Sequence, residues 1–327
     1  MQENLNWLQR AFQLKGSVIR ITYPRILFFV AIGALISWIY QQDLLNHDLE
    51  ITLSTLPTNV IYNLVLGLLL VFRTNAAYDR FWEGRKAWGS LIINLRILAR
   101  EIHLHQHFHP EVISEVNSLV NAPSNNNEKY NYNQVIAWLK LIAFSTKYHL
   151  RGECVVDHLI AEPAKIAVTG SSELELNLEQ LNLEKLKNCT HPPLQIILWL
   201  SKYFHQQHQA NYIDSTRLTQ LQSYLDQIIT GITCCERIRD TPLPVAYTIL
   251  LRRLTLLYCG LISFSLVENL GYWTSLVSGL IAFVLLGVEA LATEIENPFG
   301  YDDNDLALDD FCRNVNNNID QTTNTIL

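Results

Sequence analysis

The stretch from Leu56 to Arg85 constrains the fold of this 327-residue chain most, because an apolar helical pattern passes there without a break into a polar one. Val60, Leu64 and Leu68 recur every four residues, so they share one face of a helix. The second half is too polar for lipid and too rich in aromatic side chains for an ordinary solvated helix. We interpret the stretch as a pore-lining helix whose polar half packs against something large.

The composition favours a membrane protein with a sizeable aqueous part, since 49% of the residues are hydrophobic and only 17% are charged. A net charge of −7 argues against nucleic acid as a partner. The six cysteines show no CxxC pair or metal-type spacing, so we expect reduced, structural thiols. The N-terminal sequence lacks the basic region, apolar core and cleavage site of a secretory signal. Membrane insertion must therefore come from internal segments.

Four internal segments are candidates for crossing a membrane, at residues 26–40, 60–72, 244–266 and 272–290. None is an unbroken run of about 20 apolar residues, the usual spanning length. Soluble core helices are the alternative for any one of them, but four together with so few basic residues inside favour the membrane. Pro57 suits the first turn of the second helix, and Gly279 and Gly287 are spaced for close helix contact in the fourth.

Flanking charges predict the orientation of these segments. Lys and Arg precede the first and third segments and follow the second, where Arg73 is the nearest. The loop at 41–50 holds acids but no Lys or Arg. Because basic residues collect on the cytoplasmic side, both termini and the long middle region are expected in the cytosol.

The middle region, residues 88–241, has apolar residues recurring at three and four along several stretches, which is typical of helices. Breaks are predicted at 123–133, 162–175 and 188–193. The chain is therefore predicted to be an all-α membrane protein. Its expected parts are an N-terminal cytosolic segment, a first transmembrane pair, a cytosolic helical domain, a second pair and a C-terminal cytosolic segment, at residues 1–25, 26–87, 88–241, 242–291 and 292–327.

Enzyme signatures are absent from the sequence: there is no P-loop, GxGxxG, GxSxG or HExxH, so we do not expect an enzyme. His103, His105, His107 and His109 would form two i, i+4 pairs on a helix, a spacing that suits Zn²⁺ or Cu²⁺. The tract has no nearby cysteine and no paired acids beyond its flanks. It therefore favours a surface or interface role over a metal site.

Three acids near the third segment, Asp226, Glu236 and Asp240, are candidate proton carriers. They are better explained as salt partners of Arg237 and Arg239.

An acidic run follows the fourth segment. Within residues 294–305, Pro298 and Gly300 break the helix and are followed by closely spaced carboxylates and amides. Such oxygens suit Ca²⁺, although the spacing is not that of an EF-hand. A helix end solvated by acids explains the run equally well.

Three motifs of the chain, taken together, indicate a protein family. RTNAAYDRFWEGRKAWG at 73–89, TPLPVAYT at 241–248 and ENPFGYDDND at 296–305 resemble the bestrophin family of channels, particularly its bacterial and plant branch. The resemblance covers both ends and the order of the chain, whereas residues 110–184 match by helical character alone.

The resemblance implies a homopentamer around one axial pore, with four transmembrane helices per subunit continuous with a cytosolic helical bundle. The second helix lines a hydrophobic neck, and matching on Gly67 places Val60, Leu64 and Leu68 there. A second constriction falls on the segment from His191 to Leu194, with Pro192, Pro193 and Leu194 as its residues.

The resemblance also implies a calcium clasp. Its side-chain ligands fall on Asp302 and Asp305, and its backbone oxygens on Glu294 and Asn297. The run departs from the animal pattern at Tyr301 and Asn304, where the animal sequence is acidic. In the family a neighbouring subunit supplies a further carbonyl.

The function implied is passive conduction of chloride or other monovalent anions. No Arg or Lys lies on the Val60, Leu64 and Leu68 face, so anion preference needs helix N-termini or backbone amides aimed into the pore. A monovalent cation channel, a secondary transporter and a membrane-tethered scaffold are the alternatives. The expected setting is a lipid bilayer, either a bacterial inner membrane or a thylakoid.

Overall fold

The computed structural model describes residues 13, 16–42, 53–55, 57–108, 132–161 and 183–324, and every regular element among them is helical. The predicted all-α class is confirmed for this part of the chain. Contacts divide the chain into a first unit, Met1–Glu83 with Thr241–Asp305, and a second unit, Gly84–Asp240 with Leu306–Leu327. The sequence segment 292–327 is thus shared between the units. The predicted break at 162–175 and most of that at 123–133 lie outside the described residues.

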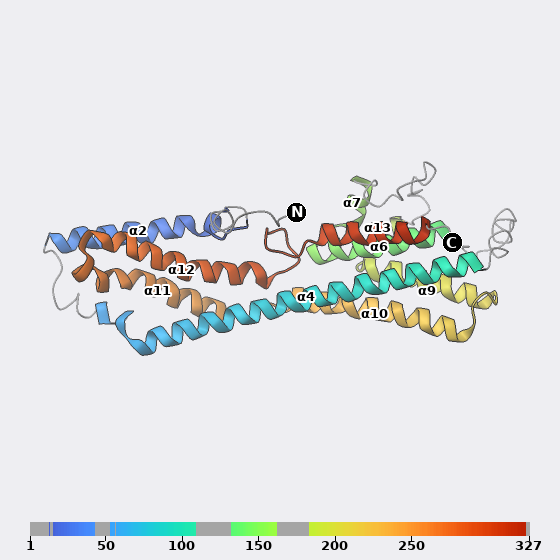
Figure 1. Cartoon of the computed structure of the whole chain (residues 1–327), viewed down its shortest axis with the longest axis horizontal. Coiled ribbons are helices and arrows are strands. Elements are labelled where there is room, and N and C mark those ends of the chain that lie inside the picture. Colours follow the sequence, from blue (N-terminus) through green and yellow to red (C-terminus); the bar gives the residue numbers. More distant parts are fainter. Residues whose placement is uncertain are drawn as a thin grey trace. The chain divides into compact units, whose positions relative to one another are not determined.

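The first unit is a group of long apolar helices that lie side by side (Figure 1). Three helical stretches are long and apolar enough to cross a membrane, namely Ile19–Gln41, Val60–His105 and Val245–Glu296. The third stretch turns back on itself and holds two α-helices, so apolar helices stand at all four predicted segments. The elements are α2 (Ile19–Gln41), the first part of α4 (Val60–Phe108), α11 (Val245–Leu270), the 3-10 turn η3 (Gly271–Trp273) and α12 (Thr274–Glu296).

Small residues bring α2 and α12 close together. Gly279 lies against Val30, and a Cβ added at Gly33 would lie 2.5 Å from Ser278 Oγ. The Ser275 hydroxyl donates to the Val30 carbonyl at 2.9 Å. Backbones approach closely where side chains are small, which confirms the predicted helix contact at Gly279.

The start of α4 differs from the prediction that placed Pro57 in its first turn. Pro57 lies in a separate helical turn, and α4 begins at Val60. The Asn59 side-chain oxygen accepts the amides of Ile61 at 2.9 Å and Tyr62 at 3.3 Å. Asn is a strong N-cap, so the cap rather than the proline sets the boundary.

Two tyrosines fix the rotation of α4 against α11. The Tyr62 hydroxyl donates to the Leu254 carbonyl at 2.9 Å, and the Tyr247 hydroxyl donates to the Leu69 carbonyl at 2.6 Å. These bonds hold one face of α4 against α11 and leave the opposite face uncovered. The buried side chains between the two helices are Leu66, Leu70 and Leu251.

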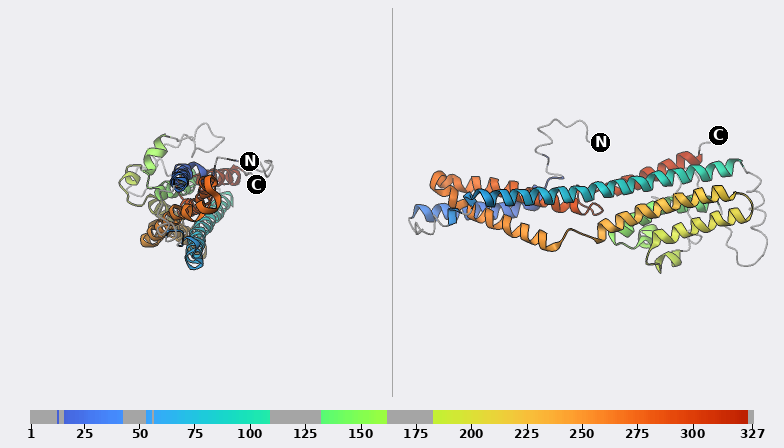
Figure 2. Two further views of the ribbon diagram at one scale, coloured as in Figure 1. Left: turned by 90° about the vertical axis from the view of Figure 1, so that its left-hand side faces the viewer. Right: turned by 90° about the horizontal axis from the view of Figure 1, so that it is seen from below.

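The second unit is built around α6, whose apolar and polar side chains are almost all buried. α9 and α10 form a hairpin beside it, seen in yellow in Figure 2. Gly231 of α10 lies so close to α4 that an added Cβ would be 3.2 Å from the Ala87 carbonyl oxygen. The elements are the second part of α4, α6 (Tyr132–Arg151), α7 (Val155–Ala161), α8 (Leu183–Lys187), α9 (Pro192–Gln209), α10 (Ser215–Asp240) and α13 (Leu308–Asn324).

The C-terminal helix α13 packs on α6 through two buried lysines. Lys140 pairs with Asp320, and Lys147 Nζ lies 2.8 Å from Asp309 Oδ1. Burial lowers the pKa of Lys140 despite Asp320. For Lys147 burial also acts downward, but the hydrogen bond to Asp309 prevails and raises its pKa. Paired charges therefore tie the end of the chain to the core of the second unit.

Candidate functional site

One face of α4 carries an uncovered apolar stripe. Val60, Leu64 and Leu68 are 79%, 66% and 49% exposed, on the side away from the bonds to α11. Tyr78 and Trp82 continue the exposed face into the polar half of the sequence stretch. An apolar surface of this kind marks contact with lipid or with other protein chains. The assignment of Val60, Leu64 and Leu68 to a pore neck stays a prediction.

A buried charge network lies at the polar end of the first unit. The Arg73 side chain is fully buried, and its Nη2 lies 3.5 Å from Glu296 Oε2, 3.8 Å from Glu289 Oε1 and 2.9 Å from Thr293 Oγ1. Arg252 Nε donates to Glu289 Oε1 at 2.8 Å. The network joins α4, α11 and α12, and its cations neutralise carboxylates that would be costly to bury alone.

The segment from Thr241 to Leu243 and the side chain of Arg80 add further hydrogen bonds to this network. The Glu296 carboxylate accepts the Leu243 amide at 3.1 Å, and its backbone carbonyl accepts Arg80 Nε at 3.1 Å. Arg80 also donates to the Thr241 carbonyl. The sequence predicted Arg73 only as a flanking charge, whereas the structure buries it. Its partners Glu289, Thr293 and Glu296 lie 216 to 223 residues along the chain, so local sequence patterns do not reveal them.

The acidic loop after α12 is closed by its own hydrogen bonds. The Asp302 amide donates to Asp305 Oδ2 at 2.8 Å, and the Asn304 side-chain amide donates to the Gly16 carbonyl at 3.2 Å. The Gly16 amide donates to Asp303 Oδ2 at 3.0 Å. The N-terminal end of the described chain is thereby tied to the loop.

The predicted calcium ligands lie in and beside this loop. The Glu294 carbonyl accepts the Asn297 amide at 3.3 Å, and Asp305 Oδ2 is the acceptor of the Asp302 amide. Chain donors thus take up oxygens that an ion would need. Among the described residues, no three carboxylates of the loop gather their oxygens at one point. The carboxylate and carbonyl oxygens fit calcium in their chemistry. Calcium binding stays a prediction.

Three ionisable side chains meet in the second unit, from α6, the start of α9 and α10. His149 Nε2 and His191 Nε2 each lie 2.7 Å from Glu236 Oε1. The two imidazole rings are 4.4 Å apart between centroids. Burial, aided by the nearby charges of His191 and Arg239, lowers the pKa of His149 although Glu236 opposes the shift. The ligand atoms lie within 4.8 Å of one another, a geometry that suits a metal ion.

Sequence reasoning missed this cluster. Glu236 was expected to pair with Arg237 or Arg239, but both of its contacts go to histidines. The expectation for Asp240 is confirmed, since its carboxylate accepts Arg239 Nε at 2.6 Å. The i, i+4 rule can find pairs on one helix but not residues brought together from three.

The predicted cytosolic constriction forms the first turn of α9. His191 is the N-cap residue, and its Nδ1 accepts the Leu194 amide at 3.3 Å. Pro193 is buried, whereas Leu194 is partly exposed, as is Leu198 one turn later. Leu194 is thus free to face another surface, and its role in a constriction stays a prediction.

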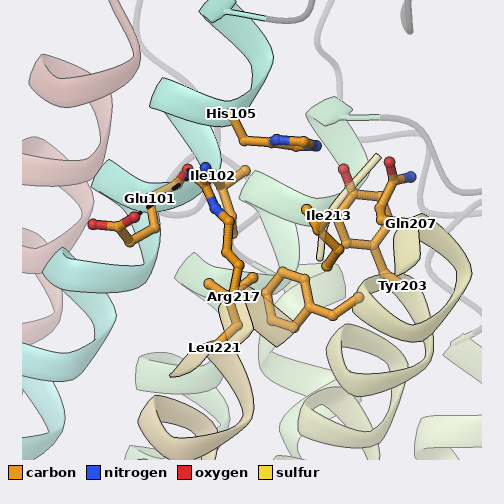
Figure 3. A pocket seen from close by; sticks show the side chains of 9 residues that line it. Glu101, Ile102, His105, Tyr203, Gln207, Ile213, Arg217 and Leu221 are labelled. Atoms are coloured by element: carbon orange, nitrogen blue, oxygen red, sulfur yellow. Dashed lines mark hydrogen bonds and ion pairs between the residues drawn. The ribbon is translucent and has the colours of Figure 1, made fainter. Parts of the chain in front are cut away.

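A small pocket lies in the second unit (Figure 3). His105 projects over it from α4, and Arg217 Nη2 lies 3.6 Å from Glu101 Oε2 at its edge. Burial raises the pKa of Tyr203 in its wall to about 12. His103 turns elsewhere, with Nδ1 3.4 Å from the Tyr132 hydroxyl.

Two side chains of the predicted histidine tract are not described by the structure. The His107 side chain and all of His109 lie outside the described residues. The predicted pairs of that tract therefore stay untested.

The fold and its apolar helices define an integral, α-helical membrane protein. A family profile described as Bacterial/Fungal Bestrophin protein matches residues 1–321. A voltage-dependent anion channel-forming protein of Nostoc is 43% identical over 319 residues, covering 97% of this chain and 92% of that protein. Another with the same description, from Synechocystis, is 33% identical over 318 residues, covering 96% and 91%.

Solved structures indicate the same family. A bacterial bestrophin homologue from Klebsiella pneumoniae, carrying a point mutation, matches with a TM-score of 0.67 at 26% identity and covers 91% of this chain and 97% of that one. The chain belongs to the bacterial and fungal bestrophin family, which confirms the resemblance drawn from its motifs.

Proposed function

We propose that this chain is the subunit of an anion channel in which copies of α4 surround a central pore. Val60, Leu64 and Leu68 form its narrow apolar neck. Chloride and other small monovalent anions pass passively down their electrochemical gradient. The relatives' description as anion channel-forming proteins supports the choice of anions.

The observation that carries the proposal is the uncovered apolar stripe of α4. The tyrosine bonds to α11 fix which face is covered, and the free face holds the three predicted neck residues. A helix of this kind meets its neighbours and a pore axis when subunits assemble in a ring. A homopentamer is the assembly that we propose.

We further propose that α2, α4, α11 and α12 each cross the bilayer once. Both termini and the second unit then lie in the cytosol, as the basic residues at the segment ends favour. The acidic loop at 41–50 falls on the opposite side.

Selectivity in such a neck follows from hydration. An apolar constriction offers no ligand to replace water, so weakly hydrated ions enter most readily. Arg73, the basic residue nearest to the stripe, is buried toward α12 and does not line the neck. We therefore expect larger, weakly hydrated monovalent anions to pass more readily than chloride.

The test of function is a current recording from purified protein in a planar bilayer with asymmetric NaCl. We expect a reversal potential displaced toward the chloride equilibrium potential. Displacement toward the sodium potential would replace the proposal with a cation channel. Fluxes that saturate far below channel rates would indicate a transporter, and no flux would indicate a tethered scaffold.

The neck has its own test. Combined alanine substitution of Val60, Leu64 and Leu68 widens the constriction, so we expect a larger conductance or a loss of gating. Leu280→Ala on α12, also an exposed leucine of the first unit, is the control and should leave the current unchanged. Unchanged currents in the triple variant would remove the neck assignment.

Calcium regulation through the acidic loop is a separate part of the proposal. It requires the Asp305 carboxylate to exchange its hydrogen bond from the Asp302 amide for the ion. Asp302→Ala with Asp305→Ala should abolish any calcium dependence of the current. A full calcium response in that variant would end the clasp proposal.

A further inference from the structure

The cluster of His149, His191 and Glu236 is separate from the neck and from the acidic loop. It joins three elements of the second unit, and one carboxylate oxygen receives both imidazoles at 2.7 Å. Neither the proposed neck nor the calcium prediction uses it, although His191 begins the segment of the predicted constriction. A simple pair contact accounts for His158 Nε2 and Glu153 Oε2, which also lie 2.7 Å apart, but it does not require a third residue.

The geometry is close to that of a zinc site. Zn²⁺ binds imidazole nitrogen and carboxylate oxygen at about 2.0–2.2 Å, which sets tetrahedral ligand atoms about 3.3 Å apart. Two of the three ligand distances are 2.7 Å, and all lie within 4.8 Å. Small side-chain rotations therefore make room for an ion between the three atoms.

Charge supports a divalent cation here. Glu236 is the carboxylate of the cluster, and the two histidines supply neutral nitrogen ligands of the type that zinc prefers. Arg239 approaches the cluster, but its guanidinium is bound to the Asp240 carboxylate and to the His149 carbonyl at 2.8 Å. Its positive charge is thus largely compensated.

We propose that His149, His191 and Glu236 form a Zn²⁺ site that leaves a fourth position open to water. Three protein ligands with an open position are one of the two recurring forms of zinc coordination. The proposal concerns metal binding and does not depend on the ion that the channel conducts.

Zinc binding at this site should also affect the start of α9, because the ring proton of His191 must change its position. Because His191 Nδ1 accepts the Leu194 amide, the ring proton without metal sits on Nε2 and points at Glu236. Zinc on Nε2 moves that proton to Nδ1, where it opposes the Leu194 amide. Metal binding thus removes the N-cap bond of α9, beside the residues of the predicted constriction.

Zinc binding is measured on the full chain purified in its native assembly without a polyhistidine tag. The protein is stripped with a chelator, loaded with ZnCl₂ and analysed for metal content, and affinity is obtained by competition with a chromophoric chelator. We expect one tightly held Zn²⁺ per chain. Glu236→Gln and His149→Gln should each weaken binding about 100-fold or more, beyond the loss from an outer partner.

His158→Gln is the matched control, because it breaks a histidine–glutamate pair of equal length outside the cluster. It should leave zinc content unchanged. Absence of bound zinc in the unaltered protein, or full binding by Glu236→Gln, would overturn the proposal. Zinc lost only on replacing His103 and His107 would also overturn it and assign the metal to the histidine tract.

Two readouts on the unaltered chain remain if the variants fail to fold. Co²⁺ loaded in place of zinc should give the intense visible absorption of four-coordinate cobalt, and a weak six-coordinate spectrum would contradict the site. The Leu194 amide should exchange hydrogen faster with zinc than without it. Unchanged exchange there would overturn the assignment of His191 Nε2 as a ligand.

Discussion

The two units differ in the side chains that they carry on their outer surfaces. In the first unit, Phe28, Leu276 and Leu280 stand exposed at 61–63% while Arg73 and Glu289 are buried. In the second unit, large apolar side chains such as Trp138 and Leu139 are almost fully buried in α6. The difference indicates two solvents, since apolar side chains face outward only where lipid or another chain covers them.

The units are alike in one respect: in the part of the chain that the structure describes, each buried cation has a carboxylate beside it. Arg73 lies between Glu289 and Glu296, and Lys140 is paired with Asp320. Burial without a partner is costly in either setting. The outer surface, not the treatment of charge, separates the two regions.

The largest effect is expected from Arg73→Gln. It removes a fully buried cation from beside the buried Glu289 and from Glu296, whose side chain is 16% exposed. Removing one partner of a buried pair costs about 3–5 kcal/mol. Thermal unfolding of the purified protein should show a severe loss of stability. Lys140→Met in the second unit should reduce stability by a similar amount, because the cost depends on how deeply the ion pair is buried and not on which unit holds it.

The control is Arg100→Gln, which removes a cation that is 59% exposed beside Glu101. Its expected effect is below about 1 kcal/mol. Equal losses in Arg73→Gln and Arg100→Gln would contradict the burial argument.

The second largest effect is expected from a charge placed on the outer face of the first unit. Leu280→Arg on α12 is expected to disfavour membrane insertion by about 2.5–3.5 kcal/mol if it lies near the bilayer centre. Leu198→Arg on α9 of the second unit should leave insertion unchanged. Membrane fractionation checks both, and equal insertion of Leu280→Arg and Leu280→Ile would break the comparison between the two surfaces.

A smaller effect is expected at the contact of α2 with α12. In Gly33→Ala the new methyl would lie 2.5 Å from Ser278 Oγ and 3.0 Å from Ser275 Cα, so overpacking should cost about 1–3 kcal/mol. Gly260→Ala on α11 meets nothing within 4 Å and serves as the control in the same thermal assay. A more stable Gly33→Ala would show that these helices are not closely packed.

The smallest effect concerns acid and the docking of α13. Burial would raise the pKa of Asp309, but Lys147 and Arg151 outweigh it and lower the pKa below its ordinary value of 3.8. The stabilisation is therefore complete above the unfolded pKa and is lost as pH falls through the folded one. Because the carboxylate is half exposed, about 1 kcal/mol or less is expected.

Thermal unfolding at neutral pH and below the ordinary carboxyl pKa measures this effect. Asp309→Asn should lose part of the acid sensitivity of the unaltered protein. Asp310→Asn, next to it and paired only with exposed Arg313, should keep it. Identical acid sensitivity in both variants would exclude a role for Asp309.

The sequence predicted the helical class, the positions of the apolar helices and the free face of α4, because length and periodicity are local properties. It did not predict the Arg73 network or the His149, His191 and Glu236 cluster. Partners from different helices there lie 37 to 223 residues apart, so no spacing rule applies. The family motifs fall on some residues of the Arg73 network: the ENPFG sequence holds Glu296, and TPLPVAYT holds Leu243.

Cysteine accessibility at Leu64 during current recording tests the central claim most directly. In Leu64→Cys channels, a charged, water-soluble thiol reagent should change the current irreversibly, because the side chain faces a water-accessible pore. The unaltered protein and Leu280→Cys should not respond. A Leu64→Cys current that ignores the reagent while Leu280→Cys responds would show that α4 does not line the pore.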